Sequence, residues 1–123
     1  MKKTELLAAM DSLLAVGKYN GDGTWLDTEL GFPLCDISDA LEEEPEYFND
    51  SDVNKKFDSV KIVLETLIQN NIKKTDLLFE SLAPGRKLFP DKEKHWWWYL
   101  PDKLMNEEQL KEWKKYLKKR GYK

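Results

Sequence analysis

Two residues in this chain could carry out nucleophilic or acid–base chemistry near neutral pH, and each type occurs once. His95 could act as a general base, but no serine or cysteine in a recognisable nucleophile context lies near it in the sequence. Cys35 is followed by Asp36, whose negative charge disfavours the reactive thiolate. We therefore expect no cysteine–histidine catalytic pair, and we expect that the protein is not an enzyme.

Motifs for a metal or a cofactor are incomplete. A single cysteine and a single histidine cannot furnish a typical zinc site. Asn20, Asp22 and Thr24 have the spacing of a calcium loop, but Trp25 occupies the position that requires glycine, and the twelfth position is not glutamate. The run Gly21–Gly23 predicts a turn and not a phosphate cradle. We expect neither a cofactor nor a metal.

The distribution of charge is the most unusual feature of the chain. Residues 1–52 carry thirteen acidic and three basic side chains, whereas residues 53–123 carry ten acidic and seventeen basic ones. The total of −3 thus hides two halves of −10 and +7. No lysine or arginine occurs between Lys18 and Lys55, a window that holds eleven carboxylates. Such a density of like charge favours association with a positively charged partner.

We predict that carboxylates in the second part of this window contact the partner. They are Asp36, Asp39, Glu42, Glu43, Glu44, Glu46, Asp50 and Asp52. The alternative is a solvated acidic face, or one paired internally with the basic C-terminal part of the chain. Glu42–Glu44 would end a short helix, where negative charge opposes the helix dipole. A local rule that is broken without compensation often marks a functional site.

Aromatic residues concentrate in the run Trp96–Leu100, which follows His95. Three successive tryptophans on a helix spread over about 200° of its circumference, so they cannot all share one narrow buried stripe. Most of these rings are expected to be buried, but Trp97 or Trp98 would lie off the inner face. An exposed tryptophan could anchor a protein interface or stack on a nucleic-acid base, and we add Trp97 and Trp98 to the predicted partner-binding residues.

Helical patterns dominate the chain. We predict helices at about 4–16, 37–44, 51–70, 75–83, 91–100 and 107–120, with Thr4, Ser51 and Thr75 as N-caps and Asn106 with Gln109 as a capping box. Gly17, Pro45, Pro84 with Gly85, Pro101 and Gly121 are expected to end helices. Residues 25–35 fit neither period, so a short strand or an ordered loop is expected there. The fold class is mainly α, one compact domain over residues 1–123 with five or six helices and room for a minor strand pair.

Composition sets the broad class. The chain has 41% hydrophobic and 12% aromatic residues, enough for a real core. Asp11 and Lys18 interrupt the apolar N-terminal segment, so a signal peptide is not expected. No apolar run approaches the roughly 20 residues of a membrane span. We expect a cytoplasmic protein that does not enter membranes.

The chain resembles the small acidic immunity proteins of bacterial toxin systems, such as those of colicins and contact-dependent growth inhibition. The resemblance lies in its size, its many acidic residues from Asp36 to Asp52 and its lack of catalytic motifs. The resemblance implies a cognate toxin domain as partner and no cofactor. The lead hypothesis is an inhibitor whose acidic surface occludes the basic active site of a toxin, such as a nuclease.

The alternative hypothesis is a nucleic-acid-binding or regulatory module. It would use the tryptophan run and the basic last helix, whose lysines and arginine lie between Lys111 and Lys123. An isoelectric point of about 5.3 argues against direct nucleic-acid binding, since nucleic-acid-binding domains are usually strongly basic.

Overall fold

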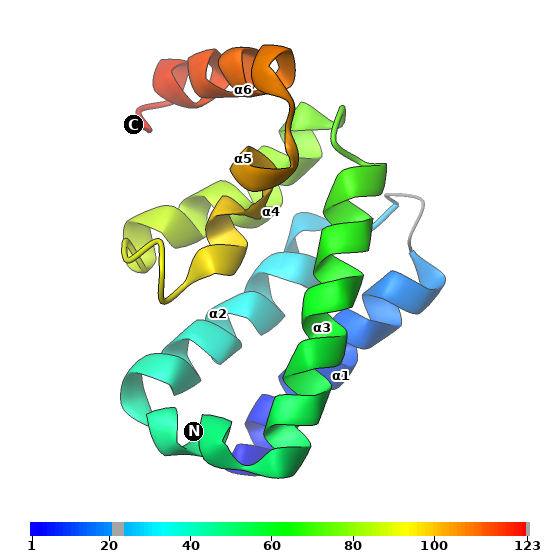
Figure 1. Ribbon diagram of the computed structural model, residues 1–123, viewed down its shortest axis with the longest axis vertical. Helices are drawn as coiled ribbons and strands as arrows, with labels where there is room; N and C mark the ends of the chain where they lie inside the picture. The colour runs from blue at the N-terminus through cyan, green and yellow to red at the C-terminus, as the bar shows by residue number, and fades with distance from the viewer. Residues whose placement is uncertain (21–23, 123) are drawn as a thin grey trace.

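The computed structural model describes residues 1–20 and 24–122. Within these ranges the protein is built of six α-helices and two short 3-10 helices, and no strand occurs (Figure 1). The α-helices are α1 (Lys3–Tyr19), α2 (Asp27–Glu43), α3 (Ser51–Asn70), α4 (Thr75–Leu88), α5 (Leu100–Leu104) and α6 (Glu107–Lys119); the 3-10 helices are η1 (Pro45–Asn49) and η2 (Trp96–Tyr99). The prediction of a mainly helical fold is confirmed, and the minor strand pair is not seen in the described part of the chain.

The helices form one elongated body with distinct ends (Figure 1). Helix α1 packs against α2 and α3, and α4 lies against α2 and η2. The end of α2, η1 and the start of α3 lie together beside the N-terminus, whereas α6 lies at the opposite end, near the C-terminus (Figure 1). The acidic segment and the basic last helix are therefore far apart.

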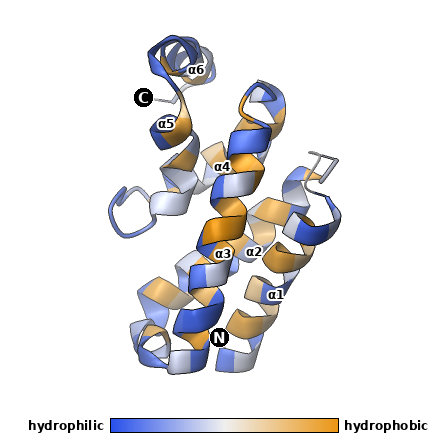
Figure 2. Ribbon diagram, turned by 45° about the vertical axis from the view of Figure 1, so that its right-hand side comes forward, coloured by the Kyte–Doolittle hydropathy of each residue, from blue (hydrophilic) through white to orange (hydrophobic). Residues whose placement is uncertain are grey.

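Helices α3 and α6 follow their sequence patterns closely. Val53, Val60, Leu64 and Leu67 are buried along α3. The predicted capping box of α6 is present, because Asn106 Oδ1 accepts from Gln109 N and Gln109 Oε1 accepts from Asn106 N. Figure 2 shows α6 as predominantly hydrophilic, and only Trp113 and Leu117 of this helix are buried.

The strand or loop predicted for residues 25–35 is wrong. Helix α2 begins at Asp27 and runs through both Gly31 and Pro33. Leu30, Leu34 and Ile37 form a buried stripe at helical spacing, and this packing outweighs the cost of the two helix-disfavouring residues. The short helix predicted at 37–44 is the second half of this longer helix, and Pro45 does follow its end, where η1 begins.

Glycines were also misread as helix ends. A Cβ atom on Gly17 would lie 2.2 Å from Val63 Cγ1, and one on Gly85 would lie 2.1 Å from Trp98 Cδ2. Both glycines lie inside helices and permit close packing rather than ending α1 or α4. Gly121, by contrast, follows α6 with a φ of 83°, as expected for a helix stop.

Several predicted boundaries also change. Asp50 caps α3, whereas Ser51 is the first residue of that helix. Likewise, α1 begins at Lys3, before Thr4, and α4 begins at Thr75 itself. Residues 91–100 do not form one helix: turns precede η2, and Pro101 lies in the first turn of α5 instead of ending a helix. The turn predicted at Gly21–Gly23, with the calcium-like position Asp22, lies outside the described residues.

Candidate protein-interaction surface

The predicted partner-binding carboxylates gather at one end of the molecule, on α2, η1 and the start of α3 (Figure 1). Asp36, Asp39, Glu42 and Glu43 belong to the second half of α2, and Glu44 follows its last residue. Glu46 lies in η1, Asp50 caps α3 and Asp52 lies in the first turn of α3. The last turn of α2 contains no basic residue, so its C-terminus is left without the positive charge that its dipole favours.

Three of these eight carboxylates are paired within the molecule. Glu42 receives Lys94 Nζ at 3.0 Å, Glu44 receives the amino group of Met1 at 3.2 Å, and Asp50 receives Lys3 Nζ at 2.8 Å. The hydrogen bond from Lys3 and the backbone N–H groups of the α3 cap lower the pKa of Asp50. Glu44 Oε2 is buried and has no partner within the described part of the chain, so only half of that carboxylate is satisfied.

The other five carboxylates form no ion pair in the described part of the chain, although the charge of Glu43 interacts favourably with the Met1 amino group and that of Asp52 with Lys3. Within residues 1–20 and 24–122, no basic group forms an ion pair with Asp36, Asp39, Glu43, Glu46 or Asp52; the pairs that exist are Met1–Glu44, Lys3–Asp50, Lys56–Asp11, Arg86–Asp102, Lys94–Glu42, His95–Glu42 and Lys115–Glu112. Partial burial raises the pKa of the Asp36 carboxyl, and the negative charges of Asp39 and Glu5 raise it further. Asp36 thus lies in a locally negative environment on α2.

A buried polar cluster fixes α2 beneath these carboxylates. The Ser38 hydroxyl is fully buried and is reached by three groups: Trp97 Nε1 at 3.1 Å, Trp98 Nε1 at 3.1 Å and His95 Nδ1 at 3.0 Å. On its other side, His95 Nε2 lies 2.6 Å from Glu42 Oε1. The cluster ties η2 and the preceding turn to α2.

The proton positions in this cluster follow from its donors. An indole N–H can only donate, so Trp97 and Trp98 occupy both lone pairs of Ser38 Oγ. The Ser38 O–H must then donate to His95 Nδ1, and Nε2 carries the imidazole proton and donates to Glu42. The hydrogen bonds from His95 and then Lys94 lower the pKa of Glu42.

The sequence of hydroxyl, imidazole and carboxylate in this cluster has the same residue types as a hydrolase triad. Its chemistry differs, because the serine hydroxyl is 0% exposed and all of its hydrogen-bonding capacity is used. The arrangement therefore positions α2 against η2. Sequence reasoning considered His95 but missed Ser38 as its partner, since 57 residues separate them.

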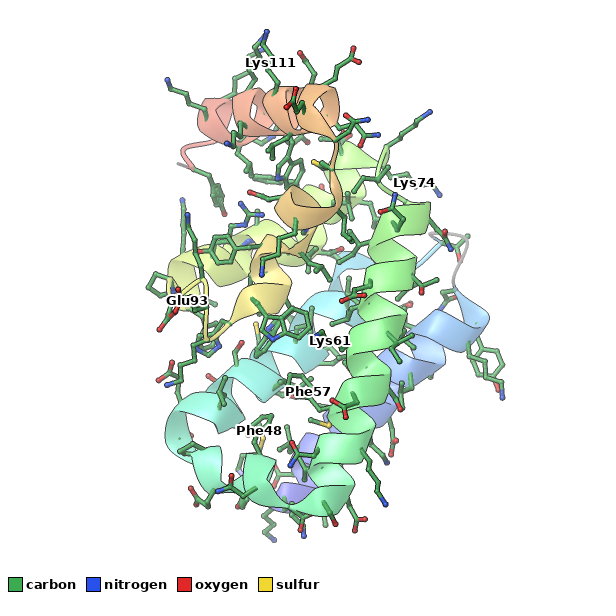
Figure 3. All side chains as sticks on the ribbon, in the orientation of Figure 1. Phe48, Phe57, Lys61, Lys74, Glu93 and Lys111 are labelled. Atoms are coloured by element: carbon green, nitrogen blue, oxygen red, sulfur yellow. The ribbon has the colours of Figure 1, made fainter. Side chains whose placement is uncertain are left out.

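The prediction that Trp97 and Trp98 contact a partner is corrected by their burial. Each is 1% exposed, because their indole N–H groups reach the buried Ser38 hydroxyl and their rings fill the core. Trp96 is half-buried and packs on Phe57 and Trp97, with Lys61 Nζ 5.5 Å from its ring centroid. Figure 3 shows Phe57 below Lys61, and Phe48 lower still in the molecule. The predicted burial of most of the run is correct.

On α4, Arg86 is buried, and all three of its guanidinium nitrogens donate hydrogen bonds. Its Nε donates to the carbonyl of Trp98 at 3.0 Å, and its terminal nitrogens donate to both oxygens of Asp102. The guanidinium also lies 4.6 Å from the centre of the Tyr99 ring. No sequence motif marks this residue, because the contacts join α4 to η2 and α5.

No group of three or more His, Cys, Asp or Glu side chains in the described ranges is arranged to hold a metal ion. None of the described helices combines the length and apolarity that a bilayer crossing demands. In comparisons with protein-family models, curated proteins and solved structures, nothing matches this chain. The class that the fold defines is a small all-helical protein with a polarised charge distribution, and function is argued from its surface.

Proposed function

We propose that this protein is a non-catalytic binding protein whose acidic face neutralises a basic protein partner, in the manner of an immunity protein that inhibits a toxin. The observation that carries the proposal is a group of five carboxylates that form no ion pair within residues 1–20 and 24–122: Asp36, Asp39, Glu43, Glu46 and Asp52. A nuclease toxin is the favoured partner class, because an enzyme that binds phosphates needs a basic cleft that carboxylates can occupy.

The geometry of α2 supports this proposal. Asp36, Asp39 and Glu43 have the spacing i, i+3 and i+7, which places them on one side of the helix. Leu34 and Ile37 bury the opposite side, and Ser38 is held by the polar cluster. A charged row on a fixed helix binds without a large ordering cost.

Electrostatics would act in two stages. At a distance, the separated acidic end would steer a basic partner and accelerate association, an effect that weakens with salt. On contact, cations of the partner would offset the negative charges of Asp39 and Glu5, which add to the effect of partial burial in raising the pKa of Asp36. Free energy stored as repulsion in the free protein would then favour the complex.

The test reverses charge on the α2 row. The variant Asp36→Lys/Asp39→Lys/Glu43→Lys and the wild type are used to capture partners from the native host, and the captured protein is purified and titrated by calorimetry. We expect the triple variant to bind at least about a hundredfold more weakly, with a shallower salt dependence. The control Glu107→Lys/Glu108→Lys/Glu112→Lys changes charge equally on α6 and should bind nearly as the wild type does. Unchanged affinity and unchanged salt dependence of the α2 variant would reject the mechanism.

A nucleic-acid-binding module remains the second candidate, and one observation favours it. A hollow of about 580 Å³ at the basic end is lined by Lys92, Lys114 and Lys118 together with Tyr99 and Tyr122. Lysines could contact phosphates and a tyrosine ring could stack on a base, in place of the buried tryptophans.

Fluorescence anisotropy with a labelled single-stranded oligonucleotide tests the second candidate. It predicts binding at low salt that Lys114→Glu/Lys118→Glu abolishes, whereas Lys111→Glu/Lys119→Glu, on the same helix outside the hollow, weakens it less. A flat titration at low salt with the wild type rejects this candidate.

A further inference from the structure

An apolar groove lies between α2 and α4. Its volume is about 240 Å³, and its lining includes Phe32 and Cys35 from α2, Pro84 and Leu88 from α4, and the ring of Trp98 beneath them. Gly31 contributes to its floor, where even a Cβ atom would approach the carbonyl oxygen of Ser81 to 3.2 Å. The groove is therefore shaped by packed helices.

Two large apolar side chains that line this groove are mostly exposed to solvent. Phe32 is 68% and Leu88 is 66% exposed, although both belong to well-packed helices. Exposed apolar side chains that gather at one place mark interaction sites, whereas isolated ones need no explanation. A groove flanked by a phenylalanine and a leucine has the composition of an interface pocket.

The size of the groove limits its occupant. Pockets for small-molecule ligands and cofactors typically occupy about 300–1,000 Å³, more than this groove offers. A cavity of roughly 150 Å³ accommodates benzene, so the groove can hold a single aromatic or large aliphatic side chain. The occupant is one anchoring residue of a larger partner.

The charge around the groove indicates what flanks that anchor. Asp27 and Glu80 line the rim, neither forms an ion pair within the described ranges, and no basic residue contributes to the lining. Along α2, Phe32 is followed by Asp36, Asp39 and Glu43 at helical spacing. The groove thus continues the acidic row on the same side of the same helix.

We propose that the groove between α2 and α4 receives an aromatic or aliphatic anchor residue of the basic partner, with lysine or arginine residues flanking that anchor. This inference rests on the proposed function, because the acidic row supplies the attraction and the groove supplies the specificity. Burial of the anchor against Phe32 and Leu88 would slow dissociation, whereas the charges mainly accelerate association.

Two synthetic peptides with blocked ends, Lys-Lys-Ser-Phe-Ser-Lys-Lys and its counterpart with serine in place of phenylalanine, serve as the probes. Titration is followed by amide NMR shifts, and the rate at which N-ethylmaleimide alkylates Cys35 reports occupancy, since this unique thiol lines the groove. We expect the phenylalanine peptide to bind roughly tenfold more tightly than its counterpart and to slow alkylation.

Variants locate the site. Phe32→Ala/Leu88→Ala should remove the advantage of the phenylalanine peptide, while Ile62→Ala, which truncates a side chain that is 67% exposed on α3, should preserve it. Equal binding of both peptides, sensitive to salt and to Asp36→Lys/Asp39→Lys but not to the groove variant, would overturn the groove and leave the acidic face standing. No shift in α2 with either peptide would overturn both proposals.

Discussion

Removal of the Ser38 hydroxyl is the sharpest test of how the acidic helix is held. Ser38→Ala deletes one oxygen atom at a position that is 0% exposed, and it leaves the apolar packing of α2 unchanged. Three polar atoms lose their hydrogen bond to Ser38 at once: Nε1 of Trp97, Nε1 of Trp98 and Nδ1 of His95. The variant therefore tests whether this buried hydroxyl stabilises the contact between α2 and η2.

The expected cost follows from the number of orphaned atoms. A buried polar group that is left without a partner costs about 1–3 kcal/mol, so three such groups give a loss of at least about 3 kcal/mol. The space left by one oxygen is too small to admit a bridging water comfortably. Natural domains of this size are stable by only about 5–15 kcal/mol, so the loss is a large part of the total.

Urea unfolding followed by tryptophan fluorescence and by circular dichroism measures the effect. With an m-value of about 2 kcal/mol/M, the midpoint should fall by about 1.5 M or more, and a variant already unfolded without urea satisfies the same expectation. Ser12→Ala is the matched control, because this exposed serine donates only to the Ala8 carbonyl of its own helix. Its midpoint should change little, since surface substitutions usually stay within about 0.5 kcal/mol.

A double-mutant cycle isolates the network from packing. Trp98→Phe removes the indole N–H. The loss of unfolding free energy that it causes should be about 1–3 kcal/mol smaller in the Ser38→Ala background than in the wild type, because in that background the N–H has no acceptor. If Ser38→Ala behaves like Ser12→Ala, or if the two substitutions are additive, the hydroxyl does not hold the cluster together.

Three further outcomes are expected. The pKa of Glu42 is lowered in the folded protein, so its carboxylate stabilises the fold fully above the ordinary pKa of 4.5, and this stabilisation is lost as the pH falls through the folded-state pKa. Glu42→Gln should therefore make the free energy of unfolding, measured by urea titration, depend less on pH below 4.5. The pKa of Asp36 is raised, so its ionisation costs stability; Asp36→Asn should raise the urea midpoint at pH 7 and give no gain below pH 3.8. Gly85→Ala should cost about 1–3 kcal/mol or more in thermal unfolding, since its Cβ would lie 2.1 Å from Trp98 Cδ2.

The helices that could be predicted from sequence are those whose stability is largely local. Helix α3 shows an unbroken apolar stripe, and α6 has a complete capping box, so both were recognised. Only the second half of α2 is predictable, because Gly31 and Pro33 weaken the first half locally and its packing against α1 and α4 restores it. Gly85 was misread for the related reason that its role is to admit Trp98, a contact that no local pattern reveals.

The same distinction between local and tertiary features explains which parts of the candidate site could be predicted from the sequence. The acidic window is visible in the sequence, because it is a property of composition over neighbouring residues. Which carboxylates remain unpaired depends on tertiary contacts: Lys94 reaches Glu42 across 52 residues, and Lys3 reaches Asp50 across 47. The burial of Trp97 and Trp98 likewise depends on Ser38, a residue with no distinguishing context in the sequence.

Internal cations pair with Glu42, Glu44 and Asp50, but within the described ranges no ion pair reaches the α2 row of Asp36, Asp39 and Glu43. The basic helix α6 lies at the opposite end of the molecule, and α2 cannot turn its charged row inward, because Leu34, Ile37 and the Ser38 cluster fix its other side. Cations from outside are therefore the means by which the repulsion within this row can be relieved. Since a ligand that binds only the folded state raises its stability, a basic partner should stabilise the wild type more than it stabilises Asp36→Asn, in which part of the repulsion is already gone.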